Sequence, residues 1–316
     1  MISVKPTLIN LEPLDYSEVA KQKLEQYFEY RELDESQPVF DQIANASVII
    51  SRLRYELSEE FLSHAPNLKF IVSATTGTNH IDINYTKKAK VEVVCLKGES
   101  EFLSKISPTA EHTWGLLLAL VRQYKPAFAS VERFEWRRDQ FPGIQLNGKV
   151  LGVVGLGRLG KMVAKYGQAF GMEVIYTDTS VNSSSYQRVS LEVLLRRSDI
   201  VSIHVPLNNS TCALISDSEF SKMKESSYLL NTSRGEVIDQ DALIHALRSA
   251  KIAGAALDVI SCEEKWAEAP PKDHVLINYA KSNTNLILTP HIGGMCPQAM
   301  RITEIFVAEK LLERVL

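Results

Sequence analysis

Cysteine is scarce in this sequence, and no two cysteines form a recognisable pair. The chain has four, Cys95, Cys212, Cys262 and Cys296, among 316 residues. They are widely spaced, with no C-x-x-C pair and no histidine cluster at metal-ligand spacing, so neither a disulfide framework nor a metal site is indicated. We interpret them as reduced thiols, which predicts a cytoplasmic protein without a bound metal.

Net charge and long apolar runs are also lacking. The formal net charge is -3, which argues against a nucleic acid or a polybasic membrane surface as partner. Residues 1–14 contain no apolar run of the kind that a signal peptide or membrane anchor needs, and the apolar stretch 109–121 is too short and interrupted to predict a membrane span. What remains is a chain of 316 residues, 45% of them hydrophobic, which is enough for two ordinary domain cores.

Short apolar strands alternate with helical patterns along most of the chain. In the first hundred residues, strands are expected over 47–50, 68–72 and 91–94, with helices over 58–65 and 82–89 between them. A long apolar helix over 109–121 follows, and the alternation then restarts with strands expected over 149–154, 173–177, 200–203, 228–231, 252–257 and 286–288. This pattern predicts an α/β fold with two doubly wound, Rossmann-like parallel sheets and a ligand cleft between the two domains.

The strand over 149–154 leads directly into a glycine-rich turn. Gly155 permits a tight turn, Gly157 permits close approach of a pyrophosphate, and Gly160 permits the following helix, expected over 162–170, to pack on its strand. Arg158 and Leu159 lie between these glycines at the start of the helix. The turn therefore predicts a dinucleotide site to which all five residues belong.

Asp178 ends the next predicted strand, about 20 residues beyond the turn. A carboxylate at this point accepts hydrogen bonds from the hydroxyls of the adenosine ribose and repels a 2′-phosphate, and neither Thr179 nor Ser180 supplies a cation. The sequence therefore predicts NAD rather than NADP. The alternative is that Asp178 only caps a turn.

The last helix, expected over 298–312, has no obvious place in the second sheet and is expected to return to the first. We therefore predict a discontinuous, flavodoxin-like substrate-binding domain over 1–107 plus 292–316. An NAD-binding Rossmann domain is predicted over 108–291. The polar stretch 181–185 is expected to be a surface loop.

Three chemically capable side chains follow strand ends in the second unit, where the ends of an open parallel sheet converge. Arg234 offers a planar fork to a substrate carboxylate and carbonyl. His291 carries an imidazole, the side chain best suited to acid/base work near neutral pH, and an ionised Glu263 would fix its tautomer. Each residue alone has a structural explanation, as an ion pair, a solvated charge or a loop histidine. Together they predict hydride transfer with acid/base assistance.

An ordered series of segments resembles one family, the NAD-dependent D-isomer-specific 2-hydroxyacid dehydrogenases. These segments are 77–82, 136–138, 155–160 with Asp178, 204–207, 231–235, 257–259 with Glu263, and 289–294. The resemblance covers nearly the whole chain. It implies an oxidoreductase that transfers a hydride between NAD and the C2 atom of a D-2-hydroxy acid or its 2-keto acid.

The resemblance also implies roles for single residues. Arg234 would bind the substrate carboxylate and carbonyl, and His291 would be the acid/base with Glu263 as its partner. Further substrate contacts would come from Arg54, Thr75, Thr76 and Gly77, and further cofactor contacts from His204, Val205, Pro206, Thr232, Ser233, Asp258, His291 and Gly293. Family members are usually homodimers built through the long helix after Ser107 and the region of Trp136. By itself, Trp136 is equally well explained as a packing aromatic.

The chain departs from the family pattern at two places. Glu264 stands where the family usually has proline, which leaves the register between Glu263 and Glu264 open, although the spacing from Asp258 favours Glu263. The segment 265–285 is longer than usual and is either a specificity loop or an insertion.

The substrate and the class of function leave alternatives open. Arg52 and Arg54 resemble a pair that faces the substrate phosphate in phosphoglycerate dehydrogenases, which makes a D-3-phosphoglycerate dehydrogenase one alternative, but solvated surface charges explain them equally well. A non-catalytic, NAD(H)-sensing interaction protein on the same scaffold is a second alternative. A relative of alanine dehydrogenase or adenosylhomocysteine hydrolase is a third, and the segment 289–294 argues against it.

Overall fold

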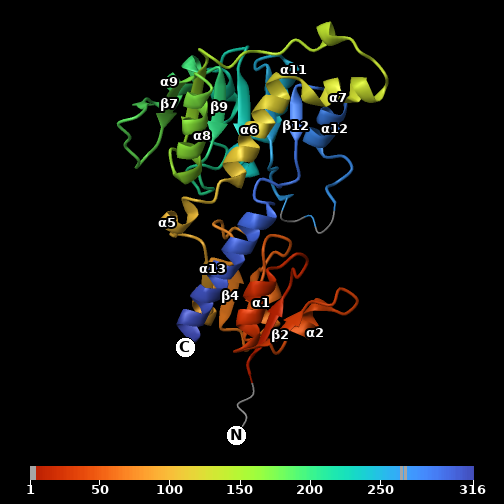
Figure 1. Cartoon of the computed structure of the whole chain (residues 1–316), viewed down its shortest axis with the longest axis vertical. Coiled ribbons are helices and arrows are strands. Elements are labelled where there is room, and N and C mark those ends of the chain that lie inside the picture. Colours follow the sequence, from red (N-terminus) through yellow and green to blue (C-terminus); the bar gives the residue numbers. More distant parts are fainter. Residues whose placement is uncertain (1–4, 264–265, 267–268) are drawn as a thin grey trace. The chain divides into compact units, whose positions relative to one another are not determined.

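The computed structural model describes residues 5–263, 266 and 269–316, and the chain divides into two compact units. Among the described residues, unit 1 contains those up to Ile106, Trp266 and Met295–Leu316, whereas unit 2 contains Ser107–Glu263 and Ala269–Gly294. Each unit is built around one parallel sheet (Figure 1).

Unit 1 holds a five-stranded sheet in the order β2-β1-β3-β4-β5, with every pair parallel. Its strands are three to four residues long. The elements are β1 (Thr7–Asn10), α1 (Glu18–Glu25), β2 (Glu29–Glu32), α2 (Val39–Ile43), β3 (Val48–Ile50), α3 (Glu59–Ser63), β4 (Phe70–Ser73), α4 (Ile83–Ala89), β5 (Glu92–Cys95), α5 (Ser100–Leu103) and α13 (Pro297–Val315).

The C-terminal helix α13 belongs to unit 1. It packs against α1, β4 and β5, and it buries Val307, Ala308 and Leu311 in a core that includes Leu8 and Val72 (Figure 1). Residues close to the C-terminus thus cover one face of a sheet built from the first hundred residues.

Unit 2 holds a seven-stranded sheet in the order β12-β11-β10-β9-β6-β7-β8, again all parallel. The elements are α6 (Pro108–Val121), α7 (Tyr124–Glu132), η1 (Arg138–Gln140), β6 (Val150–Val154), α8 (Arg158–Ala169), β7 (Glu173–Thr177), β8 (Gln187–Arg188), α9 (Leu191–Arg197), β9 (Ile200–Ile203), α10 (Asp217–Phe220), β10 (Tyr228–Asn231), η2 (Gly235–Val237), α11 (Gln240–Arg248), β11 (Gly254–Leu257), α12 (Val275–Ser282) and β12 (Leu286–Leu288).

Helices cover both faces of this sheet. Successive residues of β6 point to opposite faces and therefore contact different helices. Leu151 contacts α8 at Gly167, and a side chain at Gly152 would meet Leu194 of α9 on the other face. Helix α6 packs beside α8, and Figure 1 shows the two lying across the same face of the strands. The strand β6 is therefore buried on both faces, as its apolar sequence predicts.

The predicted class, α/β with two doubly wound parallel sheets, is confirmed. Three strands were not predicted, namely β1, β2 and β8, and the helix expected from Met162 in fact begins at Arg158, directly after Gly157. The segment 265–285, predicted as a specificity loop or an insertion, includes α12, which packs against α11 and β12. No helix among the described residues has the length and apolar character that crossing a bilayer requires.

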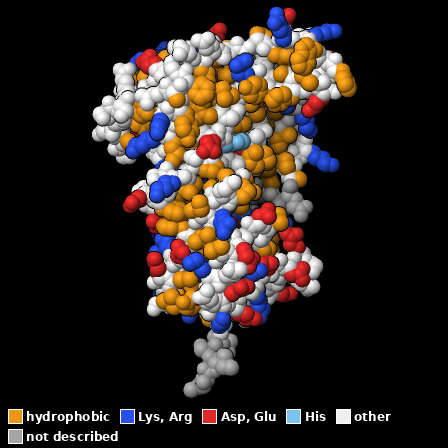
Figure 2. Space-filling model, in the orientation of Figure 1, with side chains coloured by type: hydrophobic (Ala, Val, Ile, Leu, Met, Phe, Trp, Pro, Cys, Tyr) orange, Lys and Arg blue, Asp and Glu red, His pale blue; other side chains and the backbone are white. Residues whose placement is uncertain are grey.

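Several large apolar side chains of unit 2 are exposed around α7. Phe134 is 99% and Trp136 87% exposed, and Phe128 is also on the surface. Figure 2 shows hydrophobic side chains at the upper right of the view, where Figure 1 places α7. Trp136 is thus not a packing aromatic within the described part of the chain.

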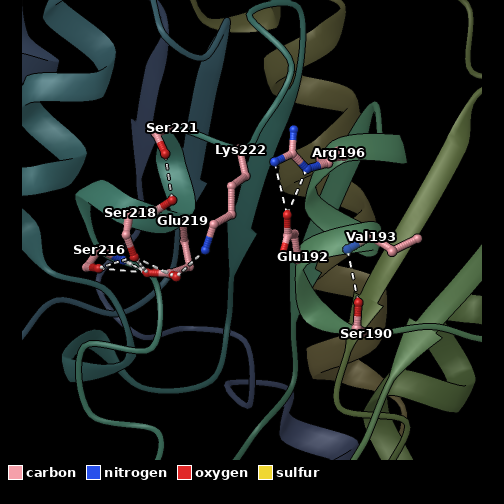
Figure 3. A network of polar contacts seen from close by, with 9 residues as sticks. All are labelled: Ser190, Glu192, Val193, Arg196, Ser216, Ser218, Glu219, Ser221 and Lys222. Atoms are coloured by element: carbon pink, nitrogen blue, oxygen red, sulfur yellow. Dashed lines mark hydrogen bonds and ion pairs between the residues drawn. The ribbon is translucent and has the colours of Figure 1, made fainter.

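Local hydrogen bonds fix the N-terminal ends of α9 and α10. The Ser216 hydroxyl donates to Glu219 over 2.7 Å in a capping box that opens α10, and Lys222 pairs with the same carboxylate (Figure 3). The Ser190 hydroxyl accepts from the Val193 amide at the start of α9. Such caps stabilise short helices that have little intrinsic stability of their own.

Candidate active site

The glycine turn after β6 has the geometry that the sequence predicts. Gly155 has a φ of 91°, and a Cβ there would lie 2.7 Å from the His204 carbonyl oxygen, so only glycine fits. A Cβ on Gly160 would lie 2.0 Å from the Gly155 carbonyl oxygen, which shows how closely α8 packs on the turn. Above Gly157, in contrast, a Cβ would meet nothing within 4 Å. The open space over Gly157 and the backbone amides at the N-terminus of α8, where Arg158 and Leu159 lie, fit a pyrophosphate.

Asp178 lies at the carboxyl end of β7 and contacts this turn. Its Oδ2 accepts from the Leu156 amide over 2.7 Å, and its Oδ1 accepts from the Ser180 and Val181 amides, both over 2.8 Å. Partial burial alone would raise the pKa of Asp178, but these amides lower it below its ordinary value, so the group is ionised. Asp178 therefore caps its own turn and also presents a carboxylate beside the glycine turn.

A cation that the sequence did not reveal lies close to Asp178. Arg188 of β8 donates to the Asp178 backbone carbonyl, and its other terminal nitrogen donates to Asn182 Oδ1 over 2.6 Å. Because this guanidinium already has two acceptors, it holds the loop after β7 in place.

His291 and Glu263 are brought together at the carboxyl edge of the same sheet. The His291 Nδ1 lies 2.5 Å from Glu263 Oε1, and Glu263 Oε2 accepts from the Ile260 amide over 3.3 Å. His291 has a left-handed backbone with a φ of 53°, and its amide donates to the Asp258 carbonyl over 2.8 Å. The carboxylate thus orients the ring and leaves Nε2 as the nitrogen that can exchange a proton. Glu264, the alternative register, lies outside the described residues.

Asp258, at the end of β11, anchors the loop that carries His291. It is only 1% exposed. Its Oδ1 accepts from Thr289 Oγ1 over 2.6 Å and from the Ile292 amide over 2.9 Å, and its Oδ2 accepts from the Gly293 amide over 2.8 Å. His112 of α6 approaches Oδ1 with its Nε2 at 3.2 Å. Burial alone would raise the pKa of Asp258, but these hydrogen bonds lower it below its ordinary value.

His112 is a site residue that sequence reasoning missed. Its Nε2 lies between Asp258 and Thr289 Oγ1, the latter at 3.0 Å. The contact joins residues 146 positions apart, and nothing in the apolar helix around His112 marks it. Oδ2 of Asp258 accepts from the Gly293 amide, and a carboxylate oxygen can accept a second hydrogen bond.

Arg234 follows β10, the strand next to β11 in the sheet. Its NH1 donates to the Ser233 carbonyl over 2.6 Å, and its own carbonyl accepts from Asn231 Nδ2 over 2.8 Å. A Cβ on the adjacent Gly235 would lie 2.1 Å from the Ile260 carbonyl carbon. The Arg234 segment therefore packs directly on the segment that leads to Glu263.

The remaining predicted cofactor residues lie along the same edge. Thr232 Oγ1 lies 2.8 Å from Thr113 Oγ1, and Ser233 Oγ donates to Asn231 Oδ1 over 2.7 Å. The Pro206 carbonyl accepts from Thr211 Oγ1 over 2.6 Å, and Val205 packs against the Gly155 position. His204 Nε2 lies 2.8 Å from Ser202 Oγ, whereas its buried Nδ1 has no partner among the described residues. Burial lowers the pKa of His204 to about 4.

The predicted substrate residues belong to unit 1. Thr75, Thr76 and Gly77 follow β4, and Thr75 Oγ1 donates to the Gly77 carbonyl over 2.8 Å. Arg54 follows β3, and its NH1 lies 2.5 Å from Glu35 Oε1. Glu35 is a second residue that no sequence pattern indicated. Among the described residues, no group of three or more histidine, cysteine or acidic side chains is arranged to hold a metal ion.

Comparison with known proteins gives consistent matches. Residues 114–293 match the model of a family described as D-isomer specific 2-hydroxyacid dehydrogenase, NAD binding domain. The hydroxypyruvate reductase of Thermotoga maritima is 32% identical over 295 residues, which cover 93% of this chain and 92% of that protein. The D-3-phosphoglycerate dehydrogenase of Methanocaldococcus jannaschii is 35% identical over 279 residues, but the match covers 86% of this chain and only 50% of that protein.

Solved structures agree with the sequence matches. A D-lactate dehydrogenase from Aquifex aeolicus, complexed with NAD and lactic acid, is similar with a TM-score of 0.84 and 30% identity over 98% of this chain and 95% of that one. This chain spans about half the length of the phosphoglycerate dehydrogenases that it matches.

Proposed function

This chain belongs to the D-isomer specific 2-hydroxyacid dehydrogenase family, and on that premise we propose that it transfers a hydride between NAD and the C2 atom of a D-2-hydroxy acid or its 2-keto acid. The predicted family and the predicted cofactor, NAD, are confirmed. The activity, the substrate and the residue roles below are our proposal.

The observation that carries the proposal is the contact of His291 Nδ1 with Glu263 Oε1 over 2.5 Å. When bound, NAD supplies the hydride acceptor, and the chain itself has to manage the proton. In oxidation, His291 Nε2 takes the proton of the substrate hydroxyl, and in reduction it returns that proton to the carbonyl oxygen. Glu263 holds the ring in one orientation.

Arg234 is assigned to the substrate. Its guanidinium offers two parallel donors to a carboxylate and the adjacent carbonyl oxygen, geometry that a lysine lacks. In unit 1, the amides around Thr75, Thr76 and Gly77 are assigned to the substrate carboxylate, which makes unit 1 the substrate-binding domain and unit 2 the NAD-binding domain.

A panel of 2-keto acids tests the function. Oxidation of NADH is followed with hydroxypyruvate, glyoxylate, pyruvate, 2-ketoglutarate and phosphohydroxypyruvate. We expect turnover of at least one of these acids. NADH binding without turnover of any of them would favour the alternative, an NAD(H)-sensing interaction protein.

We also propose that the protein forms a homodimer through the exposed aromatics around α7. Phe128, Phe134 and Trp136 together present an apolar surface of a kind that monomers rarely leave open. A second copy of the chain is the occupant that the family resemblance implies. Sedimentation of the wild-type chain should show a dimer, and a Phe134→Asp, Trp136→Asp double variant should sediment as a monomer. A monomeric wild-type chain would refute this arrangement.

A further inference from the structure

The carboxyl edge of the unit 1 sheet carries charged groups that the function above does not use. The strand order reverses between β1 and β3, and open parallel sheets bind ligands beyond their carboxyl ends at such a point. Glu12 follows β1, whereas Arg52 and Arg54 follow β3. The charge available at this edge therefore bears on which substrates unit 1 accepts.

Arg52 bonds to groups within its own unit. Its NH2 donates to the Glu12 carbonyl over 2.7 Å and to the Leu14 carbonyl over 2.5 Å. Its NH1 lies 3.8 Å from the buried carboxylate of Glu304, and the side chain is only 17% exposed. This guanidinium is mostly buried, and these contacts stabilise the loop after β1.

Glu12 adds a negative charge to the same edge. Its Oε1 accepts from the Arg52 amide over 2.6 Å, from Ser51 Oγ over 3.1 Å and from the Arg54 amide over 3.3 Å. These contacts hold the segment 51–54 in place and leave a carboxylate beside it.

The Arg54 guanidinium remains partly exposed, and it forms an ion pair with a carboxylate. Its side chain is 41% exposed, and its NH1 lies 2.5 Å from Glu35 Oε1. Glu35 lies just beyond β2, the strand next to β1, and is 66% exposed. The two arginines at this edge thus lie close to three glutamates, Glu12, Glu35 and Glu304, and no net positive charge is left over.

We propose that unit 1 selects a short, unphosphorylated 2-keto acid and that Glu35 is the residue that discriminates against a phosphate group. A phosphate dianion would have to displace Glu35 from Arg54 and would still lie close to its charge, whereas a hydroxyl or methyl group at C3 meets no such repulsion. This inference rests on the proposed dehydrogenase function.

Glu29 provides a matched control for Glu35. It is also an exposed glutamate paired with an arginine, Arg31, at 2.7 Å, but it lies at the amino end of β2. A Glu29→Gln variant changes the net charge of unit 1 by the same amount as Glu35→Gln, at the opposite end of the strand.

The test compares kcat/KM for hydroxypyruvate and phosphohydroxypyruvate. The wild-type chain should favour hydroxypyruvate by about tenfold or more, which corresponds to about one unfavourable charge contact. Glu35→Gln should narrow this preference about threefold, as expected for one exposed charge pair, and the change should shrink with added salt. Glu29→Gln should leave the preference for hydroxypyruvate unchanged. A wild-type preference for the phosphorylated acid, or an equal effect of the two variants, would overturn the proposal.

A binding measurement separates this proposal from the function itself. The affinities of glycerate and 3-phosphoglycerate are measured by calorimetry in the presence of NADH. The proposal is supported if the wild-type chain binds glycerate more tightly than 3-phosphoglycerate and the difference between the two affinities is smaller in Glu35→Gln. This holds even if no acid is turned over. In that case only the dehydrogenase function fails. Binding of 3-phosphoglycerate as tight as that of glycerate, or no binding of either, refutes it.

Discussion

Both sheets are parallel, but their carboxyl edges differ in burial and in charge. In unit 2, Asp258 is buried and accepts hydrogen bonds from Thr289, Ile292 and Gly293, so its position is fixed. In unit 1, the exposed pair of Arg54 and Glu35 stands in solvent. We call the carboxyl edge of the unit 2 sheet, where Asp258 is buried, the rigid edge. We call the carboxyl edge of the unit 1 sheet, which is exposed and nearly neutral, the open edge.

This difference separates two tasks. Under the proposed function, proton transfer needs groups that are already in position in a site of low dielectric constant, and the hydrogen bonds of Asp258 hold the loop that carries His291. Under the proposed selectivity, discrimination between substrates needs only a difference in interaction energy, which one exposed carboxylate would supply. The following predictions test the two edges, beginning with the largest expected effect.

The largest effect is expected at His291. Because the residue has a left-handed backbone, which asparagine tolerates better than alanine, the variant of choice is His291→Asn. We expect kcat/KM to fall about 1000-fold through loss of the acid/base group, while NADH still binds. The control is His245→Asn, which alters an exposed histidine of the same unit. Equal loss of turnover and of NADH binding would contradict the assigned role.

The sequence predicts the rigid edge well and the open edge poorly. The strand β6 was predicted to within one residue of its bounds because it is apolar throughout. Glu263 and His291 were singled out because they come after such strands, and the structure places their side chains in contact. The strand β2, with the sequence Glu-Tyr-Arg-Glu, lies at the edge of its sheet and buries little, so it carries no hydrophobic pattern.

Partners from distant parts of the chain were missed for a different reason. His112 meets Asp258, and Glu35 meets Arg54, only because the fold brings their elements together. Neither contact leaves a local signature, since each is specified by the packing of whole helices and strands. Prediction from sequence therefore found residues that follow a strand, but not the partners that orient or neutralise them.

Burial of His204 should lower the stability of the folded chain at low pH. His204 has a pKa of about 4 in the folded chain, below the ordinary value of 6.5 that applies on unfolding. The unfolded chain therefore binds more protons between these values, and stability falls as the pH drops. Between pH 7.5 and 5, His204 should lower the free energy of unfolding by about 2 kcal/mol.

Urea unfolding of the cofactor-free chain at the two pH values measures this loss. The His204→Gln variant should lose about 2 kcal/mol less than the wild-type chain over this pH interval. The exposed His245→Gln variant should retain the wild-type pH dependence. An identical loss in all three proteins would show that His204 is not the group responsible.

At the open edge, the two arginines should differ in their contribution to stability. Arg52 is largely buried and donates to two carbonyls, so Arg52→Ala should lower the free energy of unfolding by about 2 kcal/mol. Arg54 makes an exposed ion pair with Glu35, and Arg54→Ala should change the free energy of unfolding by less than about 0.5 kcal/mol. Chemical denaturation measures both variants. Equal destabilisation would mean that Arg54 stabilises the fold to the same extent as Arg52.

Asp178 offers the last test, because it belongs to the rigid unit but is partly open to solvent. If its carboxylate binds the ribose hydroxyls, Asp178→Ala should weaken NADH binding about tenfold, the equivalent of about 1.4 kcal/mol. NADPH binding should stay constant or improve, because a repulsive charge is removed. The control is Asp139→Ala, whose side chain is 95% exposed. Because Asp178 also accepts from the Ser180 and Val181 amides, a melting curve has to show that the variant is folded. A folded variant with an unchanged ratio of NADH to NADPH affinity would leave Asp178 as a turn cap and nothing more.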